Sequence, residues 1–341
     1  MTIALDATYS IGDELSGVGI YSRALLFGLA EAHPETGFDF CYRPHRYLRC
    51  WRERLPRNAR RRLLAGPFCP RSAAIFHGLN QRLPPGRIRR AVVTFHDLFV
   101  LSGDYSTSEF RARFAAQARD AAARADALIA VSEFTKSQLT GILGVPASRV
   151  RVIAHGIRKL AVPALTRENV ILSVGAIQKR KNLVRLVEAF ETVGPEWKLV
   201  LAGAAGFGAA EITERIQASR ALDRIRITGY LSDQELARWY ARASIFAFPS
   251  LDEGFGIPVL EAMAAGIPVI TSNRSALPEV AGNDALLVDP ERAEDLAESL
   301  RRFTQSPDLR REFAERGRRR ANLFSWEKAV RETWDVYQGL L

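Results

Sequence analysis

Two glutamates flank a glycine-rich segment in the second half of the chain, and their surroundings suggest a binding site. Glu253 and Glu261 bound the run EGFGIPVLE, which lies between the apolar SIFAFP and the helical EAMAAG. A helix start attracts phosphate through unpaired N–H groups and the helix dipole. Carboxylates accept hydrogen bonds from hydroxyl groups, and Gly254 and Gly256 let a ligand approach the main chain. The pattern therefore fits a ligand that carries both phosphate and hydroxyl groups.

A basic pair in another segment would supply positive charge for that phosphate. Lys181 follows the strand-like VILSVG by a few residues and precedes Asn182, which is placed to cap a helix. Arg180 beside it offers a planar guanidinium that suits phosphate oxygens. Phosphate near these cations and sugar hydroxyls near the two glutamates together describe a nucleotide-sugar. Solvated charges on a turn are the alternative interpretation of the pair.

Candidates in the first half are a histidine and two glycines. His96 ends the run AVVTFH and is followed by Asp97, so its side chain is expected to face a cleft, where it could donate to a sugar hydroxyl. Gly17 and Gly19 follow TIALDA at the first strand-to-helix turn, but GVG lacks the third glycine of a dinucleotide-binding fingerprint. A buried core histidine and a plain flexible turn are the alternatives. His77 and Asp97 are secondary candidates.

The elements that must position these residues alternate between strands and helices. The strand-like runs of the first half are TIALDA, FDFCY, AAIFH, AVVTFH, ALIAVS and VRVIA, with helical patterns at 18–32, 107–124 and 133–143. Those of the second half are VILSVG, KLVLAG, IRITG, SIFAFP, PVIT and ALLV, with helical patterns at 183–192, 209–220, 233–242, 258–265 and 291–304. Continuous apolar strands separated by helices favour parallel sheets that are covered on both faces.

The two series of elements predict an α/β protein with two doubly wound, Rossmann-like domains. LAVPALTREN lacks periodicity and serves as the linker, and His155 is assigned to the linker region. The predicted domains are 1–160 and 168–322, with a cleft facing the carboxyl ends of the strands, where such sheets bind ligands. Residues 325–341 form one more helix, whose apolar stripe is Trp326, Val330, Trp334 and Tyr337.

Composition is typical of a soluble globular protein of about two domains. The chain has 341 residues, of which 47% are apolar and 25% charged. Cys41, Cys50 and Cys69 are odd in number and lack C-x-x-C spacing, so they suggest neither a zinc site nor a disulfide framework. The first residues carry no basic leader, and no run approaches the roughly 20 apolar residues of a membrane-spanning helix. A cytoplasmic location is therefore expected.

All of the excess positive charge lies in the first half. Residues 1–160 contain 24 Lys and Arg against 13 Asp and Glu, a net of +11, whereas the chain as a whole carries +10. Much of the excess falls in 43–62. If a helix runs between Pro44 and Pro56, its apolar face holds Tyr47, Leu48, Trp51 and Leu55, with Arg46, Arg49 and Arg52 elsewhere. This pattern is typical of helices that lie on anionic lipid, and a solvated surface helix is the alternative. No nucleic-acid motif accompanies the charge.

Taken together, the motifs resemble the retaining glycosyltransferases of the GT-B fold, family 4. They are SGVGIYSR at 16–23, FHD at 95–97, VGAIQKRKN at 174–182, the E-x7-E pattern at 253–261 and GIPVITSNRSALPEVAG at 266–282. They follow one another in the order of that family and span most of the chain. The resemblance implies that the last helix, 323–341, returns to pack on the first domain.

The resemblance also implies roles for the candidate residues. Glu253 contacts the transferred sugar, Glu261 holds the ribose hydroxyls, and Lys181 stabilises the leaving diphosphate. Arg180 is a further phosphate ligand, since Ala176 stands where many relatives have an arginine. His96 lies close to the transferred sugar. The remaining donor-binding positions are Gly17, Gly19, Gly254, Phe255, Gly256 and Ile257.

For the reaction, the resemblance implies transfer of a hexose with retention, in which the leaving phosphate takes the acceptor proton. Mannose from GDP-mannose is expected, and UDP- or dTDP-sugars are the alternative donors. The expected acceptor is a glycan or a polyprenyl-diphosphate-linked sugar of bacterial surface polysaccharide, met at the inner face of an anionic membrane. Without a D-x-D motif or metal-ligand spacing, the chain is expected to need neither metal nor cofactor.

Two other classes of protein are open at this stage. A glycoside hydrolase could use Glu253 and Glu261, but a retaining hydrolase needs two carboxyls about 5 Å apart, and Lys181 would have no role in it. A noncatalytic module that binds polyanions through its basic half is the second rival.

Overall fold

A computed structural model describes residues 1–12, 15–66, 70, 72–158 and 160–341. The chain forms two compact units. The N-terminal unit contains Met1–Gly156 together with Phe324–Leu341, and the C-terminal unit contains Ile157–Leu323. The change of unit at Gly156 lies slightly ahead of the predicted domain end at 160. Cys69 lies outside the described residues, whereas Cys41 and Cys50 are buried free thiols.

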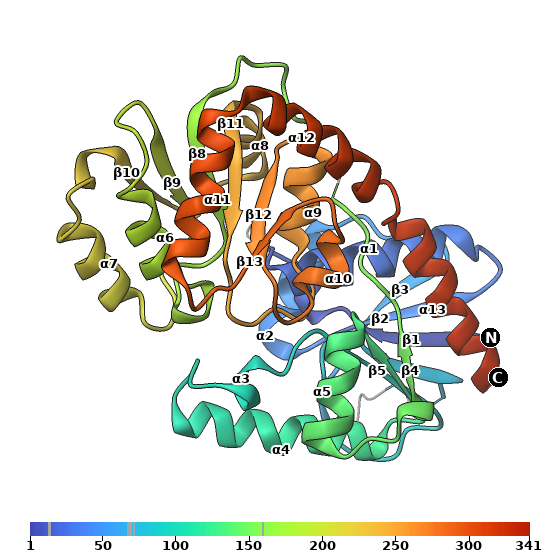
Figure 1. Cartoon of the computed structure of the whole chain (residues 1–341). Coiled ribbons are helices and arrows are strands. Elements are labelled where there is room, and N and C mark those ends of the chain that lie inside the picture. The colour runs from blue at the N-terminus through green and yellow to red at the C-terminus, as the bar shows by residue number, and fades with distance from the viewer. Residues whose placement is uncertain (13–14, 67–69, 71, 159) are drawn as a thin grey trace. The chain divides into compact units, whose positions relative to one another are not determined.

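The N-terminal unit is built on a seven-stranded parallel sheet in the order β3-β2-β1-β4-β5-β6-β7 (Figure 1). Its strands are β1 (Thr2–Asp6), β2 (Gly37–Tyr42), β3 (Ala59–Leu63), β4 (Ile75–Gly78), β5 (Ala91–Phe95), β6 (Ala127–Ala130) and β7 (Val150–Val152). Its helices are η1 (Thr8–Ser10), α1 (Gly17–Ala32), α2 (Pro44–Tyr47), η2 (Leu48–Arg52), α3 (Phe99–Ser102), α4 (Ser108–Arg124), α5 (Glu133–Leu143), η4 (Ala147–Arg149) and α13 (Trp326–Leu340). The strand order reverses between β1 and β4, which is where sheets of this kind bind ligands.

The C-terminal unit repeats this architecture with a six-stranded parallel sheet in the order β10-β9-β8-β11-β12-β13. Its strands are β8 (Glu168–Val174), β9 (Lys198–Ala202), β10 (Ile225–Gly229), β11 (Ala243–Phe248), β12 (Val269–Ser272) and β13 (Leu286–Val288). Its helices are η5 (Lys179–Lys181), α6 (Leu183–Phe190), α7 (Ala209–Gln217), η6 (Leu222–Arg224), α8 (Asp233–Arg242), α9 (Ile257–Ala264), α10 (Leu277–Ala281), α11 (Ala293–Gln305) and α12 (Pro307–Ala321). Two parallel α/β domains are thus confirmed.

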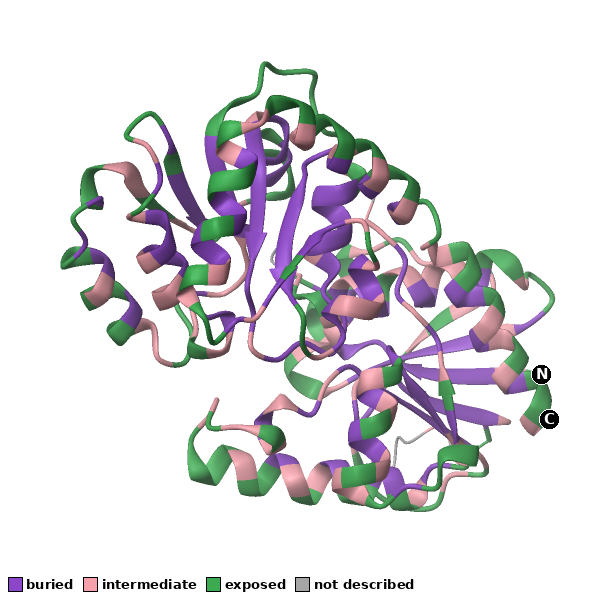
Figure 2. Cartoon of the chain, in the orientation of Figure 1, coloured by how far each residue is buried: buried purple, intermediate pink, exposed green. Residues whose placement is uncertain are grey.

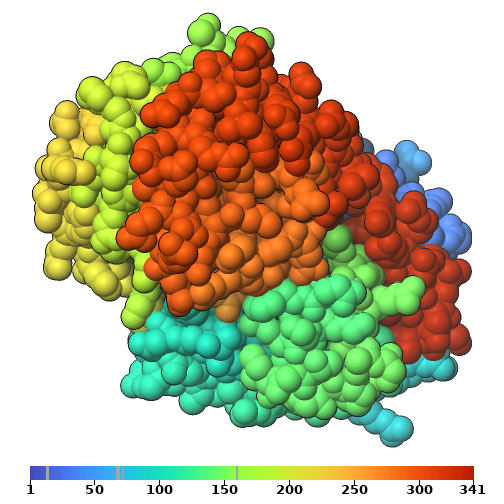
Figure 3. Space-filling view, viewed as in Figure 1, coloured from blue at the N-terminus to red at the C-terminus, as the bar shows by residue number. Residues whose placement is uncertain are grey.

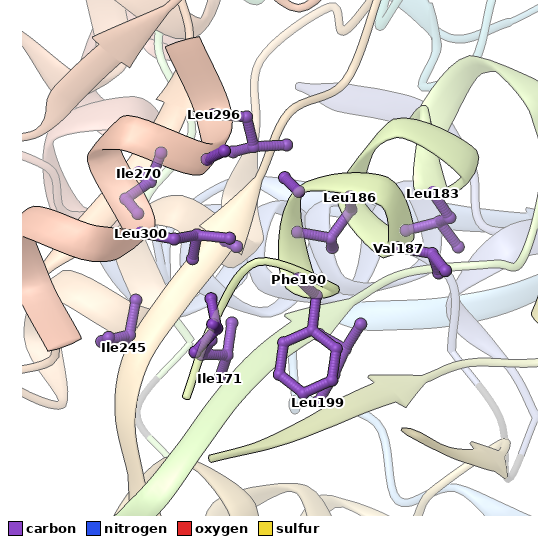
Figure 4. Packing of buried hydrophobic residues seen from close by; sticks show 14 of the residues in the cluster. Ile171, Leu183, Leu186, Val187, Phe190, Leu199, Ile245, Ile270, Leu296 and Leu300 are labelled. Carbon is purple, nitrogen blue, oxygen red and sulfur yellow. The ribbon is translucent and has the colours of Figure 1, made fainter. Parts of the chain in front are cut away.

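Apolar side chains between sheet and helices hold each unit together. In the C-terminal unit, Leu186 and Phe190 of α6 meet Leu199 of the sheet and Leu300 of α11 (Figure 4). The central strands of each sheet are buried and the outer helix faces are exposed (Figure 2), as expected for a parallel sheet covered on both sides. The residues of α11 and α12, coloured orange and red, form much of the visible surface of this unit (Figure 3).

The last helix, α13, belongs to the N-terminal unit, and its predicted return to that domain is confirmed. It packs beside α1, and Val330 and Tyr337 are buried in the core of the unit. At Gly28 of α1, an added Cβ would lie 2.6 Å from a methyl group of Val330. Because the two helices approach each other so closely, this contact requires a glycine.

The basic segment 43–62 differs from the single amphipathic helix that its spacing predicts. It forms the short α2, then η2, and ends in the edge strand β3. The sequence pattern did not predict this strand. Tyr47 and Leu55 pack against the core, whereas Leu48 and Trp51 are 84% and 63% exposed. The predicted apolar face is therefore divided into a buried part and an exposed part.

Candidate active site

The C-terminal unit brings three of the predicted residues into direct contact. The Lys181 ammonium forms a salt bridge with one carboxylate oxygen of Glu253. An Arg180 Nη1 atom lies 2.8 Å from the other oxygen. Lys181 also lies over the ring of Phe248 at the end of β11, with its Nζ 4.4 Å from the ring centroid. All three charged groups are largely shielded from solvent.

The two cations of this cluster both contact the carboxylate of Glu253. Burial alone would raise the pKa of Glu253, but the adjacent Arg180 and Lys181 outweigh it and lower that pKa to about 2. Glu253 is therefore ionised at neutral pH. Two cations held side by side in this way are groups that bind phosphate oxygens in proteins.

The backbone explains how Lys181 reaches Glu253. Gly175, which follows β8, has φ +144°, and a Cβ there would lie 3.2 Å from Cε of Lys181. Glycine thus gives the chain both the positive φ and the space for the lysine stem. The Leu251 N–H donates to the Arg180 carbonyl at 2.8 Å, so the turn that carries the cations is joined to the loop that carries Glu253.

Asn182 helps to hold this turn, but not through the helix cap that its position predicts. It precedes α6 with φ +58°, but its side chain makes no capping hydrogen bond. Instead its Nδ2 donates to the carbonyls of Pro249 and Pro290 at 3.1 and 2.6 Å. The predicted side-chain cap is wrong, because the amide ties together the segments that follow β11 and β13.

The glycine-rich segment leads into α9 as predicted. Gly256 is the residue before the helix, with φ +111°, and a Cβ there would lie 2.8 Å from Cδ2 of Leu277. Glycine is therefore required at this position. Gly254, Phe255 and Ile257 are buried beside it.

Glu261 lies in a second polar cluster, separate in its partners from that of Glu253. It is in the second turn of α9, and no acidic residue occupies the first turn, so the helix dipole does not explain the glutamate at this position. Tyr240 of α8 donates its hydroxyl to Oε2 at 3.0 Å. Arg158 donates its Nε–H to Oε1 at 3.0 Å. Neither partner belongs to a motif singled out in the sequence, and only the fold reveals them.

His96, in the N-terminal unit, is held as a neutral imidazole. It follows β5, is largely buried, and its Nε2 lies 2.8 Å from the Leu79 carbonyl oxygen. A carbonyl can only accept, so Nε2 carries the proton and Nδ1 is left as an acceptor. Burial lowers the pKa of His96 to about 4, despite the opposing effect of the Leu79 carbonyl. His96 in this state would accept, rather than donate, a hydrogen bond from a sugar hydroxyl.

The other two histidines near His96 are internal. His155 is buried against it, with ring centroids 5.3 Å apart and planes within 10° of parallel, so the assignment of His155 to a linker is wrong. His77 lies 2.6 Å through Nδ1 from the Tyr337 hydroxyl and 2.8 Å through Nε2 from the Thr94 hydroxyl. Both ring nitrogens of His77 are used within the core, which leaves this secondary candidate no atom for a ligand.

Gly17 and Gly19 lie in the first turn of α1 rather than in a loop before it. Gly19 is buried, and a Cβ there would lie 2.8 Å from the Tyr9 carbonyl oxygen. Ser16 caps this helix by accepting from the Gly19 N–H at 3.3 Å. Gly17 is exposed beside the cap.

The described residues contain neither a candidate metal site nor a membrane-spanning helix. Within the described ranges, no three or more His, Cys, Asp or Glu side chains are grouped so that they could hold a metal ion. Among the described helices, none combines the length and apolarity needed to cross a membrane.

Comparison with known proteins gives matches over most of the chain. The family model described as Glycosyl transferases group 1 matches residues 140–320, and the model described as Glycosyltransferase Family 4 matches residues 40–159. The O-antigen chain mannosyltransferase B of Escherichia coli is 30% identical over 284 residues, which are 78% of this chain and 74% of that protein. The MMP alpha-(1->4)-mannosyltransferase of Mycolicibacterium hassiacum is 32% identical over 195 residues, 56% of this chain and 43% of that protein.

A solved structure supports the fold. Sucrose-phosphate synthase from Thermosynechococcus elongatus superposes with a TM-score of 0.79 at 24% identity, covering 99% of this chain and 98% of that one. The predicted enzyme class, a transferase that moves a hexose, is confirmed over the hydrolase and the noncatalytic module. The chain belongs to the glycosyl transferases group 1 family and has the GT-B fold.

Proposed function

We propose that this enzyme transfers mannose from GDP-mannose, with retention of configuration, to a glycan or lipid-linked acceptor of surface polysaccharide. The observation that carries the donor site is the cluster in which Lys181 and Arg180 share the single carboxylate of Glu253. The oxygens of a diphosphate would pair with these two cations. Glu253 would then be free to accept a hydrogen bond from the transferred sugar.

In the proposed reaction, the bond between the sugar and the diphosphate breaks as the acceptor hydroxyl forms the new glycosidic bond on the same face. Negative charge develops on the departing nucleoside diphosphate, where Lys181 and Arg180 stabilise it. The leaving phosphate takes the proton of the acceptor hydroxyl, so no protein nucleophile is needed. The reaction yields the glycoside and the protonated nucleoside diphosphate.

The N-terminal unit is proposed to supply His96 beside the transferred sugar and the start of α1, with Gly17 and Gly19, beside the donor phosphates. Because Nε2 of His96 already donates to the Leu79 carbonyl, the contact with sugar would use Nδ1 as the acceptor. The site is proposed to work without metal or cofactor, since the two cations can neutralise the diphosphate themselves.

Similarity to mannosyltransferases supports the choice of mannose, and the relative that acts on O-antigen supports a role in polysaccharide biosynthesis. UDP- and dTDP-sugars are the alternative donors. A screen of GDP-, UDP- and dTDP-sugars for release of the nucleoside diphosphate, with and without EDTA, tests donor and metal dependence together. Fastest release from a UDP-sugar would overturn the donor assignment, and inhibition by EDTA would overturn metal independence.

Site variants in the same assay test the role of the cationic pair. Lys181→Ala should lower turnover by roughly a thousandfold, in line with the loss of one group that stabilises transition-state charge. Lys198→Ala, at an exposed lysine of β9 in the same unit, is the control and should leave turnover unchanged. Full activity of Lys181→Ala would remove the site assignment.

The acceptor is proposed to be met at the cytoplasmic face of an anionic membrane. Leu48 and Trp51 are exposed among Arg46, Arg49 and Arg52, a combination of apolar and basic groups that suits anionic lipid. Co-sedimentation with vesicles that contain anionic lipid should exceed that with neutral vesicles. The double variant Leu48→Ser, Trp51→Ser should lose this preference, and equal pelleting in all cases would contradict membrane contact.

A further inference from the structure

Arg158 connects two elements of the C-terminal unit through the carboxylate of Glu261. Its Nε donates to Oε1 of Glu261 at 3.0 Å, and its Nη1 donates to Oδ1 of Asp233, the first residue of α8, at 2.6 Å. The Arg158 side chain is mostly buried, whereas that of Asp233 is exposed. The guanidinium is therefore fixed at both ends, by a buried acid and by a surface acid.

The Glu261 carboxylate depends on this arginine for its charge. Burial raises the pKa of Glu261, and Arg158 and then the Tyr240 hydroxyl oppose that rise, while Asp233 adds to it. Among the described side chains, Arg158 is the cation that forms an ion pair with Glu261. A buried carboxylate that loses such a partner tends to become protonated.

The hydrogen bonds of Glu261 leave room for a ligand. Each carboxylate oxygen has about two lone-pair sites. Arg158 uses one site on Oε1, and Tyr240 uses one on Oε2. Each oxygen can therefore accept one more hydrogen bond, and two adjacent acceptors match the two neighbouring hydroxyls of a ribose.

We propose that Arg158 is a positioning residue for the donor, which holds Glu261 charged and oriented to accept hydrogen bonds from both ribose hydroxyls. This inference rests on the proposed nucleotide-sugar donor. Arg158 itself would not touch the ligand. Its contribution should depend on whether the ligand carries those hydroxyls.

The test compares two ligands and two proteins by isothermal titration calorimetry. Wild type and Arg158→Gln are titrated with GDP and with 2′,3′-dideoxy-GDP, or with the matching UDP pair if UDP binds more tightly. Arg158→Gln should weaken GDP binding roughly tenfold or more, the worth of a hydrogen bond to a charged group. It should leave the binding of the dideoxy compound unchanged. Arg158→Lys, which keeps the charge, should recover part of the loss.

A pH series adds a second measurement that simple loss of structure would not reproduce. In Arg158→Gln, the described groups that act on the buried Glu261 are Tyr240 and Asp233, neither of which is a cation, so its pKa should rise further. GDP binding by this variant should weaken as the pH is lowered from about 8.5 to about 6.5, while wild type stays nearly constant. Arg215→Gln is the matched control, since Arg215 is a partly buried arginine of the same unit that pairs with Glu191 instead.

The possible results separate the inference from the proposed function. Equal weakening of both nucleotides, or no weakening of either, would overturn the role of Arg158. A wild-type protein that binds no nucleoside diphosphate would overturn the proposed donor and this inference with it. If Arg158→Gln does not fold, Tyr240→Phe removes the other partner of Glu261 and should show the same selective loss for GDP.

Discussion

Two buried polar clusters, one in each unit, are stabilised by opposite means. In the C-terminal unit, Glu253 remains charged because Lys181 and Arg180 surround it. In the N-terminal unit, His77 and His96 remain neutral because burial lowers the pKa values to about 3 and about 4. A buried carboxylate stays charged where cations are retained beside it. A neutral histidine cluster, by contrast, can hold secondary elements together without any net charge.

The neutral cluster joins elements that are far apart in the chain. Hydrogen bonds run from Tyr337 of α13 to His77, on to Thr94, and from Thr94 to Tyr21 of α1. The Tyr21 ring then meets His96 edge-on, with centroids 4.7 Å apart. The last helix is thereby linked, through hydrogen bonds and one aromatic contact, to the residue proposed to meet the sugar.

The largest effect on stability is expected where a charged pair is broken. Glu253→Gln removes the negative charge that Lys181 and Arg180 share, and the free energy of unfolding of the C-terminal unit should fall by roughly 3–5 kcal/mol. Hydrogen exchange of peptides from each unit, followed by mass spectrometry, measures this loss separately for the two units. GDP should stabilise the variant more than wild type, because its phosphates can replace the missing charge.

Glu191→Gln is the control for that variant. Glu191 pairs with Arg215 closer to the surface, where an ion pair contributes about 1 kcal/mol or less. Similar losses in both variants would contradict the view that the Glu253 cluster is a special, buried arrangement.

The next effect is a pH dependence that differs between the units. Histidines of the unfolded chain take up protons below about pH 6.5, whereas His77 and His96 in the folded unit do so only near pH 3 and 4. The N-terminal unit should therefore lose about 2 kcal/mol per histidine between pH 7 and pH 5. The stability that Glu253 contributes is fully present above pH 4.5 and is lost as the pH falls toward 2.

Peptide-level hydrogen exchange at pH 7, 6 and 5, corrected for the intrinsic exchange rate, checks this difference. His77→Gln should reduce the pH dependence of the N-terminal unit by the share of one histidine. An N-terminal unit that is equally stable at pH 7 and pH 5 would show that these imidazoles are not held neutral.

A smaller effect is expected at the hydroxyl that α13 contributes to the cluster. Tyr337→Phe removes the partner of His77 Nδ1 and should lower the free energy of unfolding of the N-terminal unit by about 1–2 kcal/mol. Tyr47→Phe is the matched control, since no hydrogen bond of the Tyr47 hydroxyl occurs among the described residues. Urea unfolding of both variants should show a loss for Tyr337→Phe alone.

The smallest effect is expected at the exposed part of the basic segment. Leu48→Ser should change the free energy of unfolding by no more than about 0.5 kcal/mol, because the Leu48 side chain is 84% exposed. Thermal unfolding measures this change. A larger loss would mean that Leu48 is covered in solution. A loss of vesicle binding by the double variant Leu48→Ser, Trp51→Ser could not then be assigned to lost contact with lipid.

Much of the fold follows from local patterns in the chain. The helix predicted over 133–143 begins after the Ser132 cap and ends at Gly144 in the left-handed conformation, as its residues indicate. A capping box forms from Ser232 to Glu235, as expected for a serine that is followed three residues later by a glutamate. Apolar strands between such helices are enough to predict two parallel sheets, because this pattern can be buried in few other ways.

By itself, the sequence determined the family, the two α/β domains and the segments that carry Glu253, Lys181 and Glu261. The tertiary structure alone decided that Arg180 and Lys181 share Glu253, that Arg158 and Tyr240 hold Glu261, and that the basic segment ends in β3. The physical reason is distance along the chain: Arg158 and Glu261 are 103 residues apart. Periodicity and capping report on near neighbours, whereas ion pairing and protonation depend on whatever the fold places alongside a buried group.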